Sequence, residues 1–265
     1  MSETSRLFET VLVRPPANSY VKCVSANPAK TSIDLDLAKE QHRHYVSVLR
    51  ESGLHIIELS PLEDFPDSVF MQDPAIIGSR GTVIGRFGEA SRRGEEKALF
   101  EDLADLGMKI GTVHSIEGPG TLEGGDIMIT DRGLFAGESQ RTNEDGIRQL
   151  SACLDRLQVK IVKTRLMHLL CGCSYLSKGN MIIAPDLVDP KSFPGFRFIT
   201  IPLEESYATD ALYVGDGRVI IPSGFPKTAM KLKGADFIPV EVDVSEFYKG
   251  DGGVTCLCSP VFNLF

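Results

Sequence analysis

The sequence predicts an α/β fold in which five repeated units close into a ring. The same order of elements, most often a strand, a hairpin, a helix and a strand, recurs along the 265 residues. The repeats follow one another at about forty to fifty residues, a period typical of repeat architectures. Chemically useful residues stand near the starts of different units, so a ring would gather them at one point. An open α/β sheet is the alternative, because alternating strands and helices alone do not exclude it.

The first unit begins with a predicted strand over residues 8–14, followed by a helix over residues 34–52. The helix is recognised by apolar residues at helical spacing, namely Ala38, Tyr45, Val48 and Leu49. Gly53 is typical of a helix end, and the apolar run at residues 55–59 predicts the next strand.

The second and third units each combine a hairpin, an amphipathic helix and a further strand. The hairpins are expected to turn at residues 80–81 and 131–133, where glycine and aspartate suit tight turns. Apolar residues mark the two helices: Leu99, Leu103 and Leu106 before Gly107, and Ile147, Leu150, Leu154 and Leu157. In the second unit, strands are predicted at residues 75–77, 82–84 and 109–113. In the third unit, the hairpin is predicted over residues 126–137 and a further strand at residues 159–162.

The fourth and fifth units repeat this order with shorter helices. Their hairpins pair residues 174–176 with 181–183, and residues 211–214 with 219–221. Helices near residues 190–193 and near Ala229 lead to strands at residues 198–201 and 237–240. Residues 254–262 predict one more strand, which could pair back with the first unit.

Composition and length favour one globular domain over residues 1–265. Hydrophobic residues make up 42% of the chain, which is enough for a sizeable core. No apolar run has the length of a membrane span, and the N-terminus lacks the pattern of a secretory signal. The net charge of −8 argues against nucleic-acid binding, which needs a basic surface. We therefore expect a cytoplasmic protein without a nucleic-acid or membrane partner.

The six cysteines are expected to be reduced thiols, since the chain is long and shows no export signal. One residue separates Cys171 from Cys173, and one residue separates Cys256 from Cys258. Structural zinc knuckles place two residues between their cysteines, so we predict no metal site. The chain has no glycine-rich phosphate loop of the Walker type, so nucleotide binding is not expected.

Four short motifs carry the residues best suited to chemistry. They are Phe70-Met71-Gln72-Asp73, Leu122-Glu123-Gly124-Gly125-Asp126, Met167-His168-Leu169-Leu170 and Gly252-Gly253-Val254-Thr255-Cys256. Cysteine chemistry on a cationic guanidinium carbon needs a nucleophile, a proton carrier and acids that hold the positive charge. The cysteine, the histidine and the two carboxylates of these motifs supply that set.

Each motif also has a structural interpretation. Cys256 could be an inert thiol, and strand alternation would put its rival Cys258 on the same face. A single histidine such as His168 is often a packing residue, and the Glu123 and Asp73 motifs could be simple turns. Arg92 and Arg141 could be solvated charges, although arginine is the natural bidentate partner of a carboxylate.

Taken in order, these motifs resemble the dimethylarginine dimethylaminohydrolases, which belong to the pentein superfamily of guanidine-modifying enzymes. The resemblance is carried by residues 37–49, 67–73, 90–93, 121–126, 137–143, 168–169 and 251–256. It implies a five-bladed propeller of ββαβ modules, which agrees with the repeat described above.

The resemblance also implies roles for individual residues. It implies Cys256 as the nucleophile, His168 as general acid and base, and Glu123 as the carboxylate that orients His168. The implied substrate-binding residues are Asp73 and Asp67 at the guanidinium, Phe70 and Gln72 beside them, and Arg92 and Arg141 at the substrate's α-carboxylate.

Two positions depart from the family pattern. The family usually has glutamate where this chain has Gln72, and a neutral amide lacks one charge for a cationic substrate. Arginine deiminases typically carry His-x-Asp after the histidine, whereas this chain has His168-Leu169-Leu170. The nearer family resembles His-Leu-Lys, so Leu170 marks a divergent relative.

The sequence therefore predicts a hydrolase that cleaves a C–N bond of an N-methylated arginine or a related guanidino amino acid. The thiolate of Cys256 would form a covalent thiouronium, and His168 would move the protons, giving citrulline and an amine without a metal or organic cofactor. The only predicted partner is the small guanidino substrate. The alternatives are an arginine deiminase-like enzyme and a non-catalytic protein that binds guanidino compounds. The joint presence of Cys256, His168 and Glu123 disfavours the non-catalytic protein.

Overall fold

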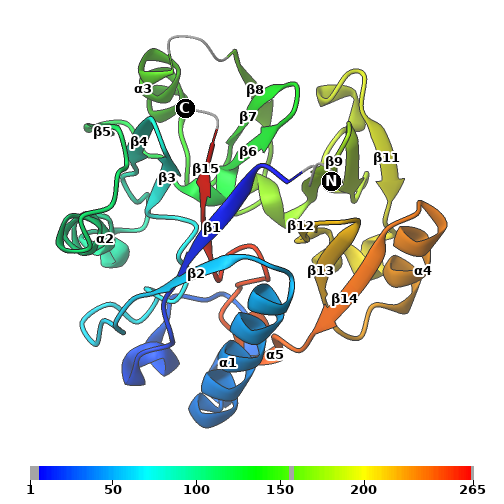
Figure 1. The fold of residues 1–265 in the computed structure, drawn as a ribbon, viewed down its shortest axis with the longest axis horizontal. Coiled ribbons are helices and arrows are strands. Elements are labelled where there is room, and N and C mark those ends of the chain that lie inside the picture. Colours follow the sequence, from blue (N-terminus) through cyan, green and yellow to red (C-terminus); the bar gives the residue numbers. More distant parts are fainter. Residues whose placement is uncertain (1–5, 155–157, 264–265) are drawn as a thin grey trace.

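The computed structural model describes residues 6–154 and 158–263, which form an α/β fold (Figure 1). The α-helices of these residues are α1 (Leu35–Glu51), α2 (Glu95–Asp105), α3 (Glu144–Cys153), α4 (Pro226–Gly234) and α5 (Ser245–Tyr248). Their strands are β1 (Phe8–Val13), β2 (His55–Glu58), β3 (Ala75–Gly78), β4 (Gly81–Ile84), β5 (Thr112–Ser115), β6 (Ile127–Thr130), β7 (Gly133–Glu138), β8 (Val159–Lys163), β9 (Cys173–Ser177), β10 (Asn180–Ile183), β11 (Arg197–Thr200), β12 (Leu212–Gly215), β13 (Arg218–Pro222), β14 (Ile238–Val242) and β15 (Ser259–Phe262). Helices α1 to α4 lie around the outside of the strands in Figure 1.

The described strands repeat one pairing pattern five times. In β6-β7-β8, β9-β10-β11 and β12-β13-β14, an antiparallel pair is followed by a parallel third strand. The six-stranded sheet, in the order β2-β1-β15-β3-β4-β5, contains two more such units. These are β3-β4-β5 and β15-β1-β2. The five-unit repeat expected from the sequence is therefore present in these strands.

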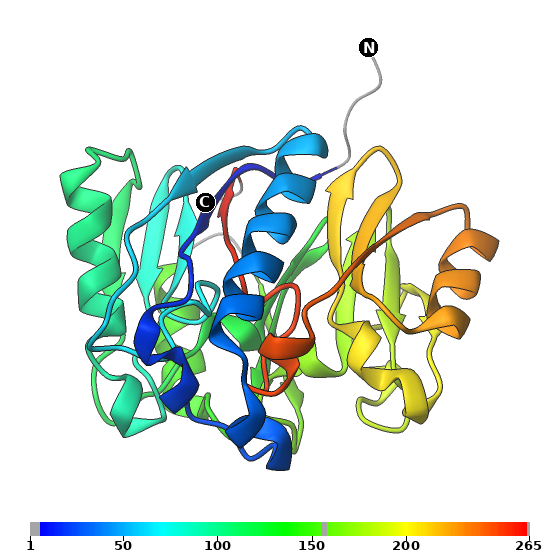
Figure 2. The same cartoon turned by 90° about the horizontal axis from the view of Figure 1, so that it is seen from below.

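The last strand completes the first unit. β15 pairs antiparallel with β1 and parallel with β3, so it joins two units into the six-stranded sheet. β15 (red) and β1 (blue) lie side by side in Figure 1, and α1 stands near the centre of the view in Figure 2. The expected return of the C-terminal strand to the first unit is confirmed.

Local signals set helix α1, which packs against the turn that precedes β15. The carboxylate of Asp34 caps the helix by accepting hydrogen bonds from backbone N–H groups of the first turn. Gly53 follows the helix with a φ of +77°, a conformation that glycine adopts without strain. The buried Tyr45 donates its hydroxyl proton to the carbonyl of Val254 at 2.7 Å. Helix α1 therefore holds the chain at residues 254–257.

Two predicted strands have wrong bounds. The strand expected at residues 109–113 begins only at Thr112, because Gly111 has a φ of +63° and lies against the backbone of Arg80. The strand expected at residues 254–262 begins only at Ser259, since residues 254–257 form a turn. Cys256 lies in this turn, outside the strand, so strand alternation does not predict that its side chain shares a face with that of Cys258.

The helices differ from the expectation in smaller ways. The predicted helix near residues 190–193 is a 3-10 helix over Pro190–Ser192. Helix α3 ends at Cys153 with Leu154 as its C-cap, and Leu157 lies outside the described residues. Across the part of the chain that the structure describes, none of the helices is long and apolar enough to cross a membrane.

Candidate active site

Each of the five units begins with a polar residue shortly before its first strand. These residues are Asp73 before β3, Glu123 before β6, His168 before β9, Asp210 before β12 and Cys256 before β15. His168 contacts Glu123 and Asp73, and the Cys256 thiol contacts Asp210. The equivalent positions of the repeat therefore bring residues from the whole length of the chain to one site.

A small cavity of about 20 Å³ lies at this site. Seven of the nine residues predicted from the sequence line it: Asp67, Phe70, Asp73, Arg92, Arg141, His168 and Cys256. Glu123 lies directly behind it and bonds His168. Gln72 is the one predicted residue that the structure places elsewhere.

His168 is held in the charged form by the acids around it. Its side chain is buried, with Nε2 at 2.9 Å from Oε2 of Glu123 and 3.8 Å from Oδ1 of Asp73. Burial alone would lower the pKa of His168, but Asp73, the hydrogen bond from Glu123, and Asp126 outweigh burial and raise the pKa to about 9. At neutral pH His168 is therefore an imidazolium that can act as an acid.

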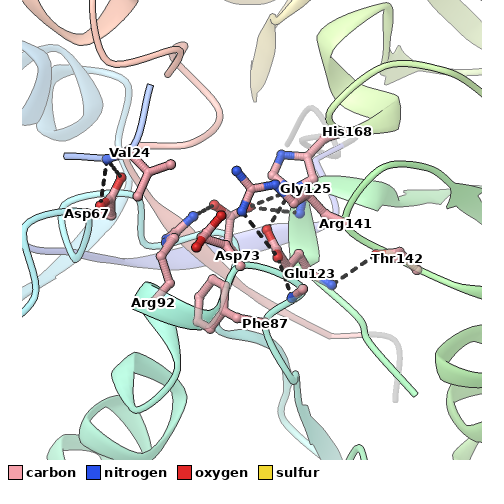
Figure 3. A network of polar contacts seen from close by, with 12 residues as sticks. Val24, Asp67, Asp73, Phe87, Arg92, Glu123, Gly125, Arg141, Thr142 and His168 are labelled. Carbon is pink, nitrogen blue, oxygen red and sulfur yellow. Dashed lines mark hydrogen bonds and ion pairs between the residues drawn. The ribbon is translucent and has the colours of Figure 1, made fainter. Parts of the chain in front are cut away.

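Asp73 stands at the centre of this network (Figure 3). Its Oδ2 accepts a hydrogen bond from Arg92 at 2.8 Å, and its Oδ1 accepts one from the backbone of Gly125 at 3.2 Å. Burial opposes the charged carboxylate, but His168 and Arg92 outweigh burial and lower the pKa of Asp73. Asp73 therefore stays ionised inside the protein, where it can hold a cation.

Arg92 and Arg141 differ in their hydrogen-bond partners. Arg92 stacks on Phe87 at 4.3 Å, and its guanidinium bonds Asp73 through one nitrogen and Glu95 through the other two. Arg141 lies 3.9 Å from Glu123, and its buried NH1 has no hydrogen-bond partner among the described residues. Arg141 therefore keeps a donor for a ligand, whereas Arg92 would have to exchange an internal bond to bind one.

Asp67 and Phe70 form the opposite wall of the cavity. Both carboxylate oxygens of the buried Asp67 accept from the backbone N–H of Val24, at 3.1 and 3.0 Å. Burial raises the pKa of Asp67 although Arg92 opposes this shift. The ring of Phe70 lies so close to Gly252 that a Cβ there would approach it to 2.1 Å. Only glycine fits at this point of the turn.

The turn at residues 254–257 separates the two candidate nucleophiles. Cys256 is half-buried and lines the cavity. Cys258 is fully buried among the apolar residues around helix α1, and its thiol bonds the Tyr45 hydroxyl. The expectation that both thiols share one face is therefore wrong. Burial, Asp210 and Asp73 raise the pKa of Cys256 well above its usual value, so the resting thiol is protonated.

Gln72 does not line this cavity. Its backbone N–H bonds the carbonyl of Cys256 at 3.2 Å, and the residue lines two other cavities, together with residues such as Ile127 and Phe262. Its Oε1 is buried without a hydrogen-bond partner among the described residues. The predicted contact between Gln72 and the guanidine end of a substrate stays a prediction, which this placement does not support.

We expect Gln72→Glu to lower stability and leave substrate affinity nearly unchanged. The new carboxylate would be partly buried without a partner, which costs on the order of 1–3 kcal/mol. The melting temperature and KM of the variant, compared with those of the exposed Gln158→Glu, check this expectation. A several-fold fall in KM would instead place Gln72 at the substrate.

The sequence did not single out two buried aspartates at the site. Asp210 precedes the predicted strand of the fifth unit, so counting one polar residue per unit would have found it. Asp126 accepts hydrogen bonds from the backbone of Leu169 at 2.8 Å and from the Ser139 hydroxyl at 2.7 Å. It thereby fixes the segment that carries His168 and the loop that precedes Arg141.

One cluster in the described part of the chain has the spacing of a metal site. Donor atoms of Asp73, Glu123 and His168 lie within 4.8 Å of one another. Arg92 already pairs with Asp73, and the imidazolium of His168 pairs with Glu123. We interpret this cluster as an ion-pair network whose acids suit an organic cation.

A larger cavity lies away from this chemistry. It measures about 540 Å³ and is lined by residues of α1 and by prolines, including His42, Arg43, Pro15 and Pro61. None of the predicted site residues lines it. Size alone would therefore favour a cavity that none of the predicted site residues lines.

Comparisons with known proteins agree with the resemblance seen in the sequence. A family model described as "N,N dimethylarginine dimethylhydrolase, eukaryotic" matches residues 16–188. The chain is 39% identical to the N(G),N(G)-dimethylarginine dimethylaminohydrolase of Pseudomonas aeruginosa, over 95% of this chain and 98% of that protein.

Solved structures of dimethylarginine dimethylaminohydrolases are also similar to this chain. A serine variant of the Pseudomonas aeruginosa enzyme complexed with citrulline has a TM-score of 0.90 at 38% identity, covering 96% of this chain and 100% of that one. A glycine variant of a dimethylarginine dimethylaminohydrolase, solved as an adduct with S-methyl-L-thiocitrulline, has a TM-score of 0.89 at 38% identity. It covers 96% of this chain and 99% of that one.

Proposed function

Because the chain belongs to the dimethylarginine dimethylaminohydrolase family, we propose that it hydrolyses a C–N bond of an N-methylated arginine or a related guanidino amino acid. The products are an amine and a ureido compound such as citrulline. One observation carries this proposal: the Cys256 thiol, the charged His168 and the ionised Asp73 line the same cavity.

The covalent half of the reaction begins at Cys256. Its thiolate attacks the guanidinium carbon, while Asp73 and Glu123 balance the positive charge of the substrate and adduct. His168 gives its proton to the leaving amine, the C–N bond breaks, and a thiouronium remains on sulphur. Because His168 is charged at neutral pH, it begins the reaction in the acid form that this step needs.

The second half uses the neutral imidazole that the first half leaves behind. His168 takes a proton from water, and the hydroxide adds to the thiouronium carbon. The adduct collapses, sulphur leaves with the bonding electron pair, and the ureido product forms. The hydroxyl proton of the adduct is released and balances the proton that the free amine takes up in solution.

The cavity has to open before a substrate of this size can bind. A volume of about 20 Å³ holds about one water molecule, far less than an amino acid. The backbone of Val24 closes one wall through Asp67, and Ser25 and Ala26 bond the carboxylate of Asp251. Val24 and Ser25 are only partly buried and Ala26 is exposed, so we propose that residues 24–26 move to admit the substrate.

We also propose that the five units are the blades of a five-bladed propeller that forms a single domain over residues 1–265. The repeated pairing pattern and the return of β15 to β1 support this arrangement. So does the meeting of one polar residue from each unit at the site. The cytoplasmic location stays a prediction.

A substrate panel tests the proposed function. We expect release of a ureido product from dimethylarginine and monomethylarginine, and little or none from arginine or agmatine. Preferred turnover of arginine would favour a deiminase-like enzyme. Binding without turnover on the whole panel would favour the non-catalytic alternative.

Arg141→Ala is expected to raise KM for dimethylarginine by about 10- to 100-fold. A hydrogen bond to a charged group contributes about 1.5–3 kcal/mol, and the unpartnered NH1 of Arg141 is the donor that a substrate carboxylate would use. Dimethylagmatine, the analogue of dimethylarginine without the carboxylate, should therefore keep its kcat/KM. Steady-state kinetics on both compounds measure the difference.

The exposed Arg148 on α3 provides the matched control. Arg148→Ala should leave KM for dimethylarginine unchanged. An equal loss of kcat/KM for dimethylarginine and dimethylagmatine in Arg141→Ala would contradict carboxylate binding and assign Arg141 to the guanidinium end. Arg92→Ala is a less specific test, since it also removes a partner of Asp73 and Glu95.

A further inference from the structure

The proposed reaction leaves one proton without an acceptor. The resting Cys256 carries a thiol proton, because burial and two acids raise its pKa. The histidine cannot take this proton at neutral pH, since the acids around it already hold its ring in the charged form. Another group must accept the proton before sulphur can attack.

Asp210 is the carboxylate that the thiol contacts. Sγ of Cys256 lies 3.7 Å from Oδ2 of Asp210, a distance at which a thiol donates a hydrogen bond. The other oxygen, Oδ1, accepts from the backbone N–H of Thr255 at 2.7 Å, so the carboxylate is held in place. Gly253 is part of this fit, because a Cβ there would come within 2.4 Å of the Asp210 carboxylate.

We propose that Asp210 is a further catalytic residue that takes the thiol proton of Cys256 and returns it at the end of the cycle. This role rests on the proposed function and adds to it. The S–H bond breaks, the proton moves to Oδ2, and the electron pair left on sulphur forms the bond to the guanidinium carbon. Asp210 stays protonated through the thiouronium. When the C–S bond breaks, the departing thiolate takes the proton back.

Charge explains why this transfer suits the site. An ionised Asp210 beside the thiol disfavours a thiolate, and this repulsion ends when Asp210 itself receives the proton. The negative charge moves from oxygen to sulphur, next to the incoming guanidinium, so no charge is added to the buried centre. Burial favours the neutral acid and raises the pKa of Asp210 to about 6. His168 is then free to protonate the amine.

Asp210→Asn tests the role, because the amide keeps the shape and the acceptor for Thr255 but cannot take a proton. We expect kcat/KM for dimethylarginine at pH 7 to fall by about 100-fold, which is typical of a lost acid–base group. The activity should then rise by about tenfold per pH unit up to pH 9, as the thiol ionises to solvent.

The pH response belongs to Cys256 if no group that faces Asp210 titrates in this range. Burial raises the pKa of Cys171 and Cys258 to about 12, and it raises those of Tyr45 and Tyr207 well above their usual value. Asp73 has a lowered pKa and stays ionised. His168 begins to lose its proton only near pH 9, which sets the upper end of the range.

Glu205→Gln is the matched control. Glu205 is a buried carboxylate in the 3-10 helix Leu203–Thr209, and it bonds the first turn of α4 rather than the site. This variant should keep the kcat/KM and pH profile of the wild type. An equal loss of activity at every pH in Asp210→Asn would overturn the proposal in favour of a purely structural role. Higher activity at pH 7 would overturn it as well, since Asp210 would then only repel the thiolate.

Infrared spectroscopy provides a measurement that does not depend on the folding of Asp210→Asn. In His168→Gly labelled with ¹³C-aspartate, the thiouronium should accumulate with S-methyl-L-thiocitrulline, because its methanethiolate leaving group needs no proton from His168. A protonated aspartate carbonyl band should appear as it forms, and the lack of such a band would overturn the proposal. A wild-type enzyme inactive on the whole substrate panel would overturn the proposed function, and this role with it.

Discussion

Cys256→Ser is expected to abolish turnover of dimethylarginine, with a loss of about 1,000-fold or more. A serine hydroxyl is a far weaker nucleophile than a thiol at neutral pH. Among the described residues that line the cavity, Cys256 is the one cysteine, so no second thiol can replace it. The fold should survive, because the substitution changes one atom of a half-buried side chain. The rate of citrulline formation and the melting temperature together check this result.

Cys258→Ser is the control variant, because Cys258 is the other candidate nucleophile. Cys258 is fully buried beside Tyr45, so a serine there should lower the melting temperature by placing a hydroxyl in an apolar environment. Most of the turnover should remain at a temperature where the variant is folded. If Cys258→Ser lost turnover and Cys256→Ser stayed active, the nucleophile would be Cys258 and not Cys256.

His168→Gly is expected to lower kcat by about 100- to 10,000-fold, because both proton transfers lose their carrier. In the wild type, the acid form of His168 persists up to its raised pKa of about 9, so kcat should fall only above that pH. Glu123→Gln removes the hydrogen bond that helps to raise this pKa, and the fall should then begin at a lower pH. Steady-state rates between pH 6 and 10 measure both changes.

The same group links stability to pH. The pKa of His168 is higher in the folded protein than the usual value of about 6.5 in an unfolded chain. Its charge therefore contributes stability that is complete below about pH 6.5 and is lost as the pH rises toward 9. Undiminished turnover in His168→Gly, or a pH limit that does not move in Glu123→Gln, would contradict the role of the Glu123–His168 pair.

Local signals let the sequence determine the elements. Asp34 and Gly53 bound the first helix, and the hairpin turns mark four of the five units, because capping and turn chemistry act within a few residues. The family resemblance is confirmed by the comparisons, and it rests on short motifs whose order survives in a single sequence. The strand at residues 254–262 was overestimated, since close contacts of Gly252 and Gly253 with distant side chains produce a turn there.

Only the tertiary structure decided which side chains meet. Gln72 lines other cavities than the neighbouring Asp73 does, and all three guanidinium nitrogens of Arg92 donate to Asp73 and Glu95. Cys256 rather than Cys258 faces the cavity, and Asp210 lies against it. Cys256 and Asp210 are 46 residues apart, so no local pattern connects them. The sequence by itself determined the units and the residue types at their starts; packing between the units determined the pairs, because side-chain partners depend on backbone positions far apart in the chain.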